Sequence, residues 1–474
     1  MPILERHLGL YTDHYELTMA QGYLLSGRKD TPACFDYFFR KNPFNGGYVV
    51  FAGLSDLLDL LENLCFDEED CRYLKSIGFD ARFVEYLKGF RFTADIYAPE
   101  EGEIVFPYEP VVRVEGNIIE SQIIETMLLN ILNFESLIAT KASRMRQAAV
   151  DRLLIDFGLR RAQGTGGILA SRAAVIGGLD GTSNVYSAFM YGLKSAGTQA
   201  HSWVQTFDDE IDAFRTFAEL MPERCVLLAD TYDTLRSGIP NAIIVAKEME
   251  QRGERLFGVR LDSGDLAALS RKARKMLDNA GLNYVRIMSS NQLDEYAIRE
   301  LLAGGAPIDA FGIGTKLVTG QADAALDGVY KLSMSGGRPR LKISETPEKI
   351  ILPGVKNVLR FVDAEGSFYS DCIALHDEGR PDKIYGIRDS DKGMAAAAFN
   401  SENLFHKVME RGKKAAGKRT PSEISGYVRS RLGRLRDACK RFDSPEVYNV
   451  GLSGRLRDLR ATLIDEAVKK AGGR

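Results

Sequence analysis

The sequence contains little histidine and little cysteine, and it lacks any long apolar run. Its six cysteines form no CxxC pair and show no spacing typical of metal ligands, which argues against a zinc site and favours reduced thiols. No window reaches the roughly 18 to 20 apolar residues of a membrane span, and the N-terminal stretch lacks the apolar run of a signal peptide. These absences predict a cytoplasmic protein that is not bound to a membrane.

The chain also has little net charge of either sign. The formal net charge is −3 over 474 residues, which argues against a protein that binds nucleic acid through general electrostatic attraction. Hydrophobic residues make up 45% and charged residues 27% of the chain, as is ordinary for a globular enzyme. This length provides ample material for a core and predicts roughly two or three domains.

The middle of the chain alternates between short apolar runs and helical patterns, which implies a parallel sheet with right-handed crossovers. The strands are expected at Leu153–Phe157, Val175–Gly178, the run into Gly197, Cys225–Ala229, Leu256–Leu261, Tyr284–Met288 and Ala310–Ile313. Seven such units suit a closed or nearly closed barrel, and a doubly wound sheet is the alternative.

The flanking regions predict a different organisation. Residues 120–147 have the apolar spacing of a long core helix. Residues 328–375 suggest antiparallel strands that join an N-terminal sheet, whereas residues 400–440 and 453–471 are mostly helical and basic, typical of a solvated face. The fold class expected is α/β: an irregular βα barrel at 120–327, an N-terminal α/β sheet domain at 1–119, and a mixed β then helical, basic C-terminal region at 328–474.

His201 is one of only five histidines, and it lies among small residues that form turns. Gly197 can adopt a positive φ, and Thr198 and Ser202 can each donate a hydrogen bond to an anion. The expected position is a loop at the carboxyl end of a strand, where βα proteins bind their ligands. Because a lone histidine is more often structural than catalytic, its interpretation depends on the neighbouring strand ends.

Polar side chains follow each expected strand, and in a barrel these strand ends converge on one face. Residues 312–315 offer unobstructed backbone N–H groups for a phosphate, and Phe157 offers a flat face for an aromatic ring. Carboxylates that can hold sugar hydroxyls or Mg²⁺ are present at Asp230, Asp262 and Asp265. Cations are present at Arg160, Arg161, Arg260 and Lys316. Together these types imply a phosphorylated sugar, an aromatic ring and a metal-bound polyphosphate.

The motifs around these residues resemble those of the nicotinate phosphoribosyltransferase family. They are YTDHYELTMAQGY, FDYFFRKNPFNGGY, DFGLRRAQGTGG, LDGTSN, GTQAHS, LADTYDT, GVRLDSGDL, SSN and FGIGTKLVT. The resemblance runs from Tyr11 to Lys331, whereas residues 375–474 match no motif of the family. It implies transfer of a phosphoribosyl group from phosphoribosyl pyrophosphate to nicotinate in the salvage synthesis of NAD, with ATP as a co-substrate and Mg²⁺ as cofactor.

The resemblance implies catalytic roles for three residues. His201 would be phosphorylated by ATP, and turnover of the phosphohistidine would couple ATP hydrolysis to the transfer. Arg260 would contact the nicotinate ring or its carboxylate, and Asp262 would orient the ribose or the catalytic water. The resemblance also places Asp230 near Mg²⁺ and the pyrophosphate.

Other residues would bind the substrates in a homodimer with composite active sites. Phe157 would stack on one face of the pyridine ring, and Tyr15 of the partner subunit would stack on the other. The pyrophosphate would contact Arg160, Arg40 and Lys41. The 5-phosphate would lie against Gly312, Gly314 and Thr315. The remaining candidates for substrate binding are Thr182, Ser183 and Asn291.

Ser183 bears on the choice of base. The similar nicotinamide phosphoribosyltransferases carry an aspartate at this position, where it accepts a hydrogen bond from the amide. A carboxylate ligand would be repelled by aspartate, whereas serine can donate to it, which favours nicotinate. The alternatives are transfer to nicotinamide or another pyridine and, more remotely, an inactive barrel that acts as a binding subunit. A quinolinate phosphoribosyltransferase fits less well, because that family is shorter and needs no phosphohistidine.

Overall fold

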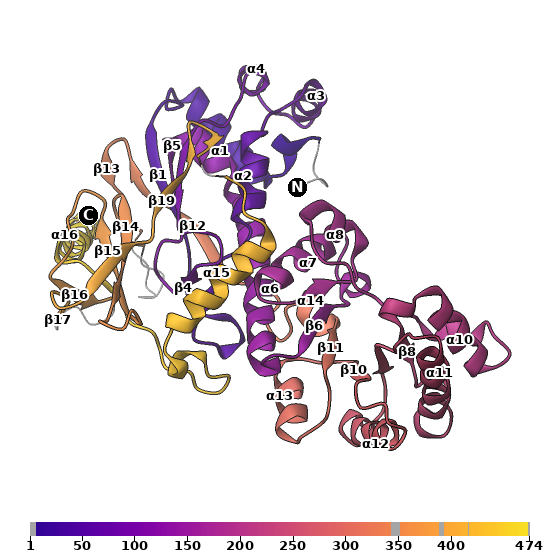
Figure 1. Cartoon of the computed structure of the whole chain (residues 1–474). Coiled ribbons are helices and arrows are strands. Elements are labelled where there is room, and N and C mark those ends of the chain that lie inside the picture. The colour runs from indigo at the N-terminus through magenta and orange to yellow at the C-terminus, as the bar shows by residue number, and fades with distance from the viewer. Residues whose placement is uncertain (1–5, 343–350, 388–392, 416, 473–474) are drawn as a thin grey trace. The chain divides into compact units, whose positions relative to one another are not determined.

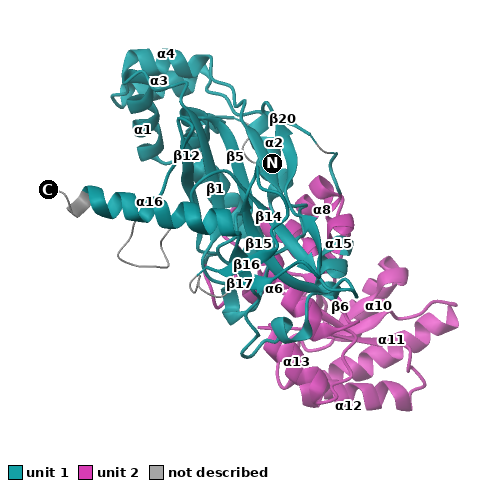
Figure 2. Ribbon diagram, turned by 90° about the vertical axis from the view of Figure 1, so that its left-hand side faces the viewer, with its two compact units in different colours: residues 1–137, 325–419, 426–474 teal, residues 138–324, 420–425 magenta. Residues whose placement is uncertain are grey.

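The computed structural model describes residues 6–342, 351–387, 393–415 and 417–472. The chain forms two compact units (Figure 2): unit 1 comprises residues 1–137, 325–419 and 426–474, and unit 2 comprises residues 138–324 and 420–425. The sequence pattern predicts that the barrel domain begins at residue 120, but residues 120–137 belong to unit 1.

Unit 1 contains a seven-stranded sheet in which β1 (Pro32–Phe39) is the third strand. Every residue of β1 after Pro32 is buried, as in a strand covered on both faces. The strands β12 and β5 pair antiparallel with β1 on its two sides. The full order is β13 (Arg338–Pro339), β12 (Gly328–Ser335), β1, β5 (Val112–Asn117), β3 (Asp95–Ala98), β19 (His406–Glu410) and β20 (Lys413–Lys414).

A second sheet of unit 1 has the order β17 (Gly393–Ala395), β16 (Lys383–Gly386), β21 (Val450–Leu452), β15 (Phe368–Leu375), β14 (Lys356–Val362) and β18 (Asn400–Asn403). The strands expected within residues 328–375 are therefore divided between the sheets. β12 pairs with β1, whereas β14 and β15 pair with each other. A short pair, β2 (Val49–Val50) and β4 (Ile104–Val105), completes the strands of this unit within the described residues.

The helices of unit 1 depart from the sequence pattern in one region, residues 400–414. The long helix expected at 120–147 is present as α5 (Ile118–Ile123) and α6 (Glu125–Ala149). Other helices are α1 (His14–Leu25), α2 (Leu54–Glu62), α3 (Glu68–Ser76), α4 (Ala81–Lys88), α15 (Pro421–Arg434) and α16 (Gly454–Gly472). The prediction that residues 400–414 are helical is wrong, because β18 pairs with β14 and β19 pairs with β3. Pairing with distant strands overrides the local preference there.

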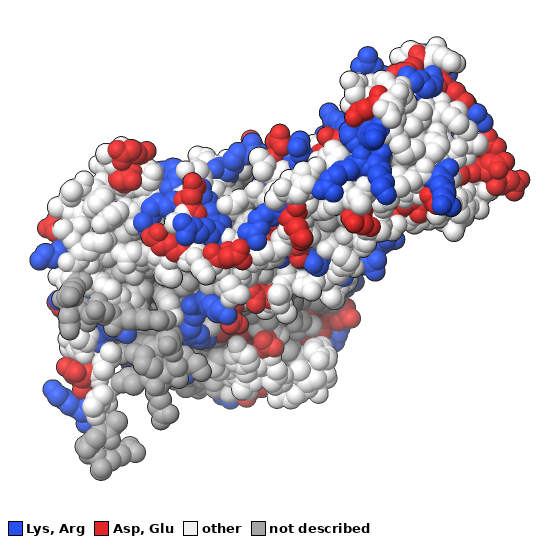
Figure 3. All heavy atoms as spheres, turned by 90° about the horizontal axis from the view of Figure 1, so that it is seen from below, with Lys and Arg blue, Asp and Glu red and all other residues white. Residues whose placement is uncertain are grey.

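The basic C-terminal residues are largely paired with acids. Lys414 and Lys418 contact Asp59, and Arg431 contacts Glu103 and Glu402. The face shown in Figure 3 likewise mixes basic and acidic side chains. None of the helices in the described part of the chain combines the length and apolar character that a membrane crossing needs.

Unit 2 contains a sheet of six parallel strands. Their order is β7 (Gly181–Thr182), β6 (Leu153–Asp156), β11 (Ala310–Ile313), β10 (Arg286–Ser290), β9 (Gly258–Leu261) and β8 (Val226–Leu228). The helices are α7 (Gly166–Ile176), α8 (Val185–Tyr191), α9 (His201–Gln205), α10 (Glu210–Leu220), α11 (Ile239–Gln251), α12 (Leu266–Asn279), α13 (Glu295–Ala303) and α14 (Thr315–Val318). Figure 1 shows α10 to α13 flanking β8 to β11.

The segment 195–199 connects the two edges of this sheet. Ser195 forms an isolated parallel bridge with Thr182 of β7. The side-chain amide of Gln199 donates to the Val226 carbonyl of β8 over 3.4 Å. The expected strand that runs into Gly197 is thus only this bridge, and the sheet forms an irregular βα barrel, which confirms the expected fold class.

The strand expected at Val175–Gly178 is wrong. Helix α7 extends to Ile176, and the strand follows later, at Gly181–Thr182. Residues Leu169 to Ile176 are all buried. A helix that is buried on every side has no clear amphipathic period, so this short run could not be distinguished from a strand.

Candidate active site

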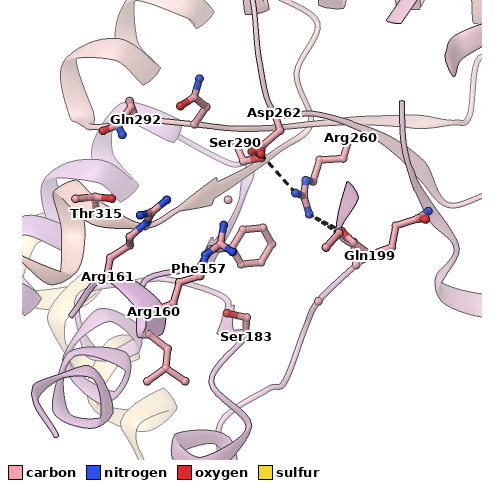
Figure 4. Close-up of a pocket in the computed structure, with 17 residues that line it drawn as sticks. Phe157, Arg160, Arg161, Ser183, Gln199, Arg260, Asp262, Ser290, Gln292 and Thr315 are labelled. Atoms are coloured by element: carbon pink, nitrogen blue, oxygen red, sulfur yellow. Dashed lines mark hydrogen bonds and ion pairs between the residues drawn. The ribbon is translucent and has the colours of Figure 1, made fainter. Parts of the chain in front are cut away.

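A pocket of about 460 Å³ lies in unit 2 at the carboxyl ends of the parallel strands (Figure 4). Side chains that follow β6, β7, β9, β10 and β11 meet there with the 197–200 segment, at the place where βα barrels bind ligands. The predicted site residues that line it are Phe157, Arg160, Ser183, Arg260, Asp262, Asn291, Gly312, Gly314 and Thr315.

Phe157 forms an aromatic wall of the pocket. A Cβ atom added at Gly312 would lie 2.4 Å from Cε2 of the Phe157 ring, so only glycine leaves room for the ring. The guanidinium of Arg260 lies 5.8 Å from the ring centroid. The sequence predicts a phosphate contact at Gly312, but close packing against Phe157 accounts for this glycine. A flat apolar face beside a cation suits a planar anion.

Arg260 is a partly desolvated cation with hydrogen-bonding capacity left over. Its Nη1 donates to Thr198 Oγ1 over 2.5 Å and to the Gln199 carbonyl over 3.3 Å. Its Nη2 lies 3.7 Å from Asp262 Oδ2, and its Nε is buried without a partner among the described residues. Burial lowers the pKa of Arg260, while Asp262 acts in the opposite direction. An anionic ligand would satisfy these donors.

Asp262 and Asp230 are joined by hydrogen bonds. The backbone N–H of Asp262 donates to Asp230 Oδ2 over 2.9 Å, and the Ser263 hydroxyl donates to the same oxygen over 2.6 Å. The Ser290 hydroxyl donates to Asp262 Oδ1. The other oxygen of Asp230, Oδ1, is buried without a partner in the described part of the chain. A buried carboxylate oxygen of this kind suits a divalent cation.

His201 is the first residue of α9 and is partly exposed. Its Nδ1 lies 3.1 Å from Thr231 Oγ1, and its Nε2 lies 4.0 Å from Asp262 Oδ2. His201 is not among the residues that line the pocket, although Gln199 and Ala200 are. The ring therefore adjoins the pocket through Asp262 and is accessible from solvent.

Two predicted pocket residues are engaged elsewhere. Thr182 is fully buried and does not line the pocket, because its hydroxyl donates to Asp156 Oδ2 over 2.7 Å. Lys316 forms an ion pair with Asp294 at 2.6 Å and does not line the pocket either. Both residues are predicted to face the pocket because they follow a strand. Position after a strand does not show which side chain is the nearest hydrogen-bonding or ion-pair partner.

Tyr15, Arg40 and Lys41 belong to unit 1, and the residues that line this pocket all belong to unit 2. Tyr15 is about half exposed on α1. Arg40 and Lys41 follow β1. Their predicted contribution to the site stays a prediction.

Leu159, Gln199 and Gln292 also line the pocket, although none of them is among the predicted site residues. Gln292 follows β10 and Leu159 follows β6, so the rule that selects strand ends would have found both. Gln199 also follows an expected strand, the run into Gly197, which the structure reduces to an isolated bridge. Elsewhere, His7, Asp67 and Asp70 of unit 1 form a group that could hold a metal, but Asp67 and Asp70 form the N-terminal capping box of α3.

Three family models match successive parts of the chain. They describe the nicotinate phosphoribosyltransferase N-terminal domain at residues 10–133, the nicotinate phosphoribosyltransferase family at residues 153–360, and its C-terminal domain at residues 355–460. The last match corrects the sequence analysis, which finds no family motif in residues 375–474.

Similar proteins are found across bacteria and eukaryotes. The chain is 43% identical to nicotinate phosphoribosyltransferase of Bacillus subtilis over 459 residues, which cover 94% of this chain and 93% of that protein. It is 45% identical to a nicotinate phosphoribosyltransferase of Mycobacterium tuberculosis over 381 residues, or 80% and 81% of the two chains. The crystal structure of human nicotinic acid phosphoribosyltransferase superposes with a TM-score of 0.87 at 31% identity, covering 95% of this chain and 99% of that chain.

The barrel, the pocket at its strand ends and these matches define a phosphoribosyl-transferring enzyme. The family models together span most of the chain, and its relatives align over nearly their whole lengths. The chain belongs to the nicotinate phosphoribosyltransferase family.

Proposed function

We propose that this protein transfers the phosphoribosyl group of phosphoribosyl pyrophosphate to nicotinate, with ATP hydrolysis coupled to the transfer, in the salvage synthesis of NAD. The products are nicotinate mononucleotide, diphosphate, ADP and phosphate. The observation that carries this proposal is the combination of the Phe157 ring, the Arg260 guanidinium and the Ser183 hydroxyl in one pocket. An aromatic acid needs a flat face, a cation and a neutral donor. The names of the relatives in Bacillus subtilis and man support the same substrate.

The transfer depends on position and charge rather than on covalent chemistry with the sugar. Loss of diphosphate from C1 develops oxocarbenium character, and the pyridine nitrogen attacks from the opposite face. Phe157 and Arg260 orient the ring, and Arg160 contacts the diphosphate. Asp230, whose Oδ1 has no other described partner, would hold Mg²⁺, which when bound neutralises charge on the leaving group.

His201 is the proposed acceptor of the γ-phosphoryl group of ATP. Its accessible ring, held between Thr231 and Asp262, supports this role. His201→Ala is expected to abolish ATP hydrolysis and to leave a slow transfer that does not need ATP. Gln205→Ala, at an exposed position of the same helix, is the matched control and should retain coupling. Absence of an acid-labile phosphate on the His201 peptide in mass spectra of ATP-treated protein would contradict the role.

The overall function is tested by one assay. Purified protein is incubated with phosphoribosyl pyrophosphate, Mg²⁺ and either nicotinate or nicotinamide, with and without ATP, and the mononucleotide is measured. Nicotinate should react faster than nicotinamide, and ATP should raise the yield. Preference for nicotinamide would favour the alternative substrate, and no turnover with any pyridine would favour a binding subunit without activity.

We further propose a homodimer in which Tyr15, Arg40 and Lys41 of the partner subunit complete each site. Helix α8 supports a partner, because Val185, Tyr186 and Phe189 are exposed on it, at 71%, 46% and 83%. Tyr15→Ala and Arg260→Ala are each expected to be nearly inactive. Co-expression should restore up to about a quarter of the wild-type activity, because about half of the dimers are mixed and each mixed dimer has one intact site. No recovery in confirmed mixed dimers would mean that each chain builds its own site.

A further inference from the structure

Asp156, the last residue of β6, lies behind the pocket rather than in it. It is fully buried, and three donors surround its carboxylate. The backbone N–H of Gly158 donates to Oδ1 over 2.7 Å. The hydroxyls of Ser171 and Thr182 each donate to Oδ2 over 2.7 Å. A carboxylate with three donors at good distances is satisfied without any ligand, so binding chemistry does not explain its presence.

On one side, this carboxylate fixes the turn that carries Phe157. The bond from Gly158 to the side chain two residues earlier closes a tight turn around Phe157. The Phe157 N–H donates to the Ile313 carbonyl over 2.7 Å. A Cβ atom added at Gly158 would lie 2.1 Å from Val318 Cγ1, so the turn has no room to shift toward α14. These contacts fix the backbone that carries the Phe157 ring.

On the other side, the same residue fixes Ser183. The Ser183 N–H donates to the Asp156 carbonyl over 2.8 Å. Thr182, immediately before it, donates its hydroxyl to the Asp156 carboxylate and accepts from the Asn184 N–H over 3.0 Å. The backbone on both sides of Ser183 is therefore tied to Asp156 or to the hydroxyl that Asp156 holds.

We infer that Asp156 is a positioning residue that sets the spacing between the Phe157 ring and the Ser183 hydroxyl, and through them the affinity for the aromatic acid. The inference rests on the proposed function, because it assigns the ring and the hydroxyl to the same nicotinate molecule. Phe157 and Ser183 come from two different strand ends, β6 and β7, and both line the pocket. Asp156 and Thr182 join these two strand ends through one carboxylate.

This role differs in a measurable way from a general contribution to stability. If the bond between Asp156 and Thr182 is lost, the Phe157 ring and the Ser183 hydroxyl move relative to each other. The KM for nicotinate should rise because both groups contact the same molecule. Residues at other strand ends, such as Gly314 and Thr315, do not bond to Asp156, so the KM for phosphoribosyl pyrophosphate should change little. A merely structural group would instead lower the amount of folded enzyme and leave both KM values unchanged.

Thr182 offers a matched pair of variants that leaves the pocket lining intact. Thr182→Val keeps the shape but removes the hydroxyl, and Thr182→Ser keeps the hydroxyl. Thr182→Val removes the hydroxyl that donates to Asp156 and accepts from the Asn184 N–H, and it should raise the KM for nicotinate about fivefold. Thr182→Ser should restore the wild-type KM. Asp156→Asn is the second variant, because an amide can still accept from Gly158, and it should give a smaller rise confined to nicotinate.

The experiment measures kcat and both KM values of each variant, together with binding of nicotinate by calorimetry and the circular dichroism spectrum. Equal KM values for nicotinate in the Val and Ser variants, or a parallel rise in both KM values, would overturn the inference. If Thr182→Val does not fold, Asp156→Asn is compared with the wild type instead. An unchanged KM for nicotinate, or a parallel rise in both KM values, would then overturn the inference. A wild-type protein that neither binds nor converts nicotinate would refute the proposed function, whereas an active wild type with insensitive variants would refute only the positioning role.

Discussion

Two arginines, Arg360 in unit 1 and Arg260 in unit 2, use the same functional group in opposite ways. Both lie in strands, β14 and β9, and both are charged groups withdrawn from water. Arg360 is completely buried and its guanidinium is surrounded by acceptors. Arg260 is 13% exposed and is only partly paired.

Every nitrogen of the Arg360 guanidinium has an acceptor. Its Nε and Nη2 donate to Asp371, its Nη1 donates to Glu103 over 2.7 Å, and its Nη2 also donates to the Ile104 carbonyl over 2.7 Å. Burial alone would lower the pKa of Arg360, but Asp371 and Glu103 raise it well above its ordinary value. Each nitrogen of this guanidinium has an acceptor, and the side chain is fully buried, so no ligand can reach it.

Arg260 has fewer partners, and burial lowers its pKa. One hydroxyl and one carbonyl accept from its Nη1, while Nε has no partner among the described residues. A buried donor without a partner carries a desolvation cost that an anionic ligand can relieve. A guanidinium with an acceptor at every nitrogen, like that of Arg360, serves the fold. A guanidinium with an unpaired nitrogen, like that of Arg260, serves binding.

Arg360→Met should have the largest effect, and only on stability. It leaves Asp371 and Glu103 buried without their cation, which should lower the free energy of unfolding by about 3–5 kcal/mol. Denaturant unfolding of the full-length variant measures this change. The kcat/KM of the folded enzyme should stay near the wild-type value. Arg429 is exposed, so Arg429→Met is the control and should leave stability unchanged. A large loss of kcat/KM at full stability would break the comparison.

Arg260→Ala should show the reverse pattern. Loss of the partly unpaired cation should lower kcat/KM for nicotinate about a hundredfold, equivalent to about 2.7 kcal/mol, while the unfolding midpoint changes little. Arg260→Lys keeps the charge but not the planar set of donors, and it should retain an intermediate activity. Steady-state kinetics and thermal unfolding on the same samples separate the two effects. An unstable but fully active Arg260→Ala would contradict the assignment.

Ser183→Asp tests whether the pocket depends on charge complementarity with its ligand. A carboxylate placed beside the carboxylate of nicotinate should lower kcat/KM for nicotinate about tenfold or more, a cost of roughly 1.4 kcal/mol or more. Ser183→Asn, which is similar in size to aspartate and uncharged, separates charge from bulk and should lose less. An unchanged kcat/KM in Ser183→Asp would remove Ser183 from the selection of acid over amide.

Thr198→Val should have the smallest effect and refines the description of Arg260. It removes the hydroxyl that accepts from Nη1, so the guanidinium should become less well oriented and kcat/KM should fall about threefold. Thr198→Ser retains the hydroxyl and should behave like the wild type. Equal activity of both variants would show that the Gln199 carbonyl alone orients Arg260.

Much of unit 2 could be predicted from sequence because parallel strands are short apolar runs that end in polar residues. Phe157, Arg260, Asp262 and Asn291 were found by this rule, and all line the pocket. The rule failed in α7, where a fully buried helix resembles a strand. It also failed at residues 400–414, whose strands exist only because β14 and β3 provide partners.

Sequence alone was sufficient to identify the α/β class, the family and the residue types at the strand ends, because these depend on local patterns and motifs. Which of those residues bind ligand depends on packing between distant segments. Thr182 faces Asp156, Lys316 pairs with Asp294, and Gly312 makes room for the Phe157 ring. A polar side chain bonds to the nearest available partner, and that partner lies tens of residues away along the chain, so only the folded arrangement shows which hydrogen-bonding groups remain available.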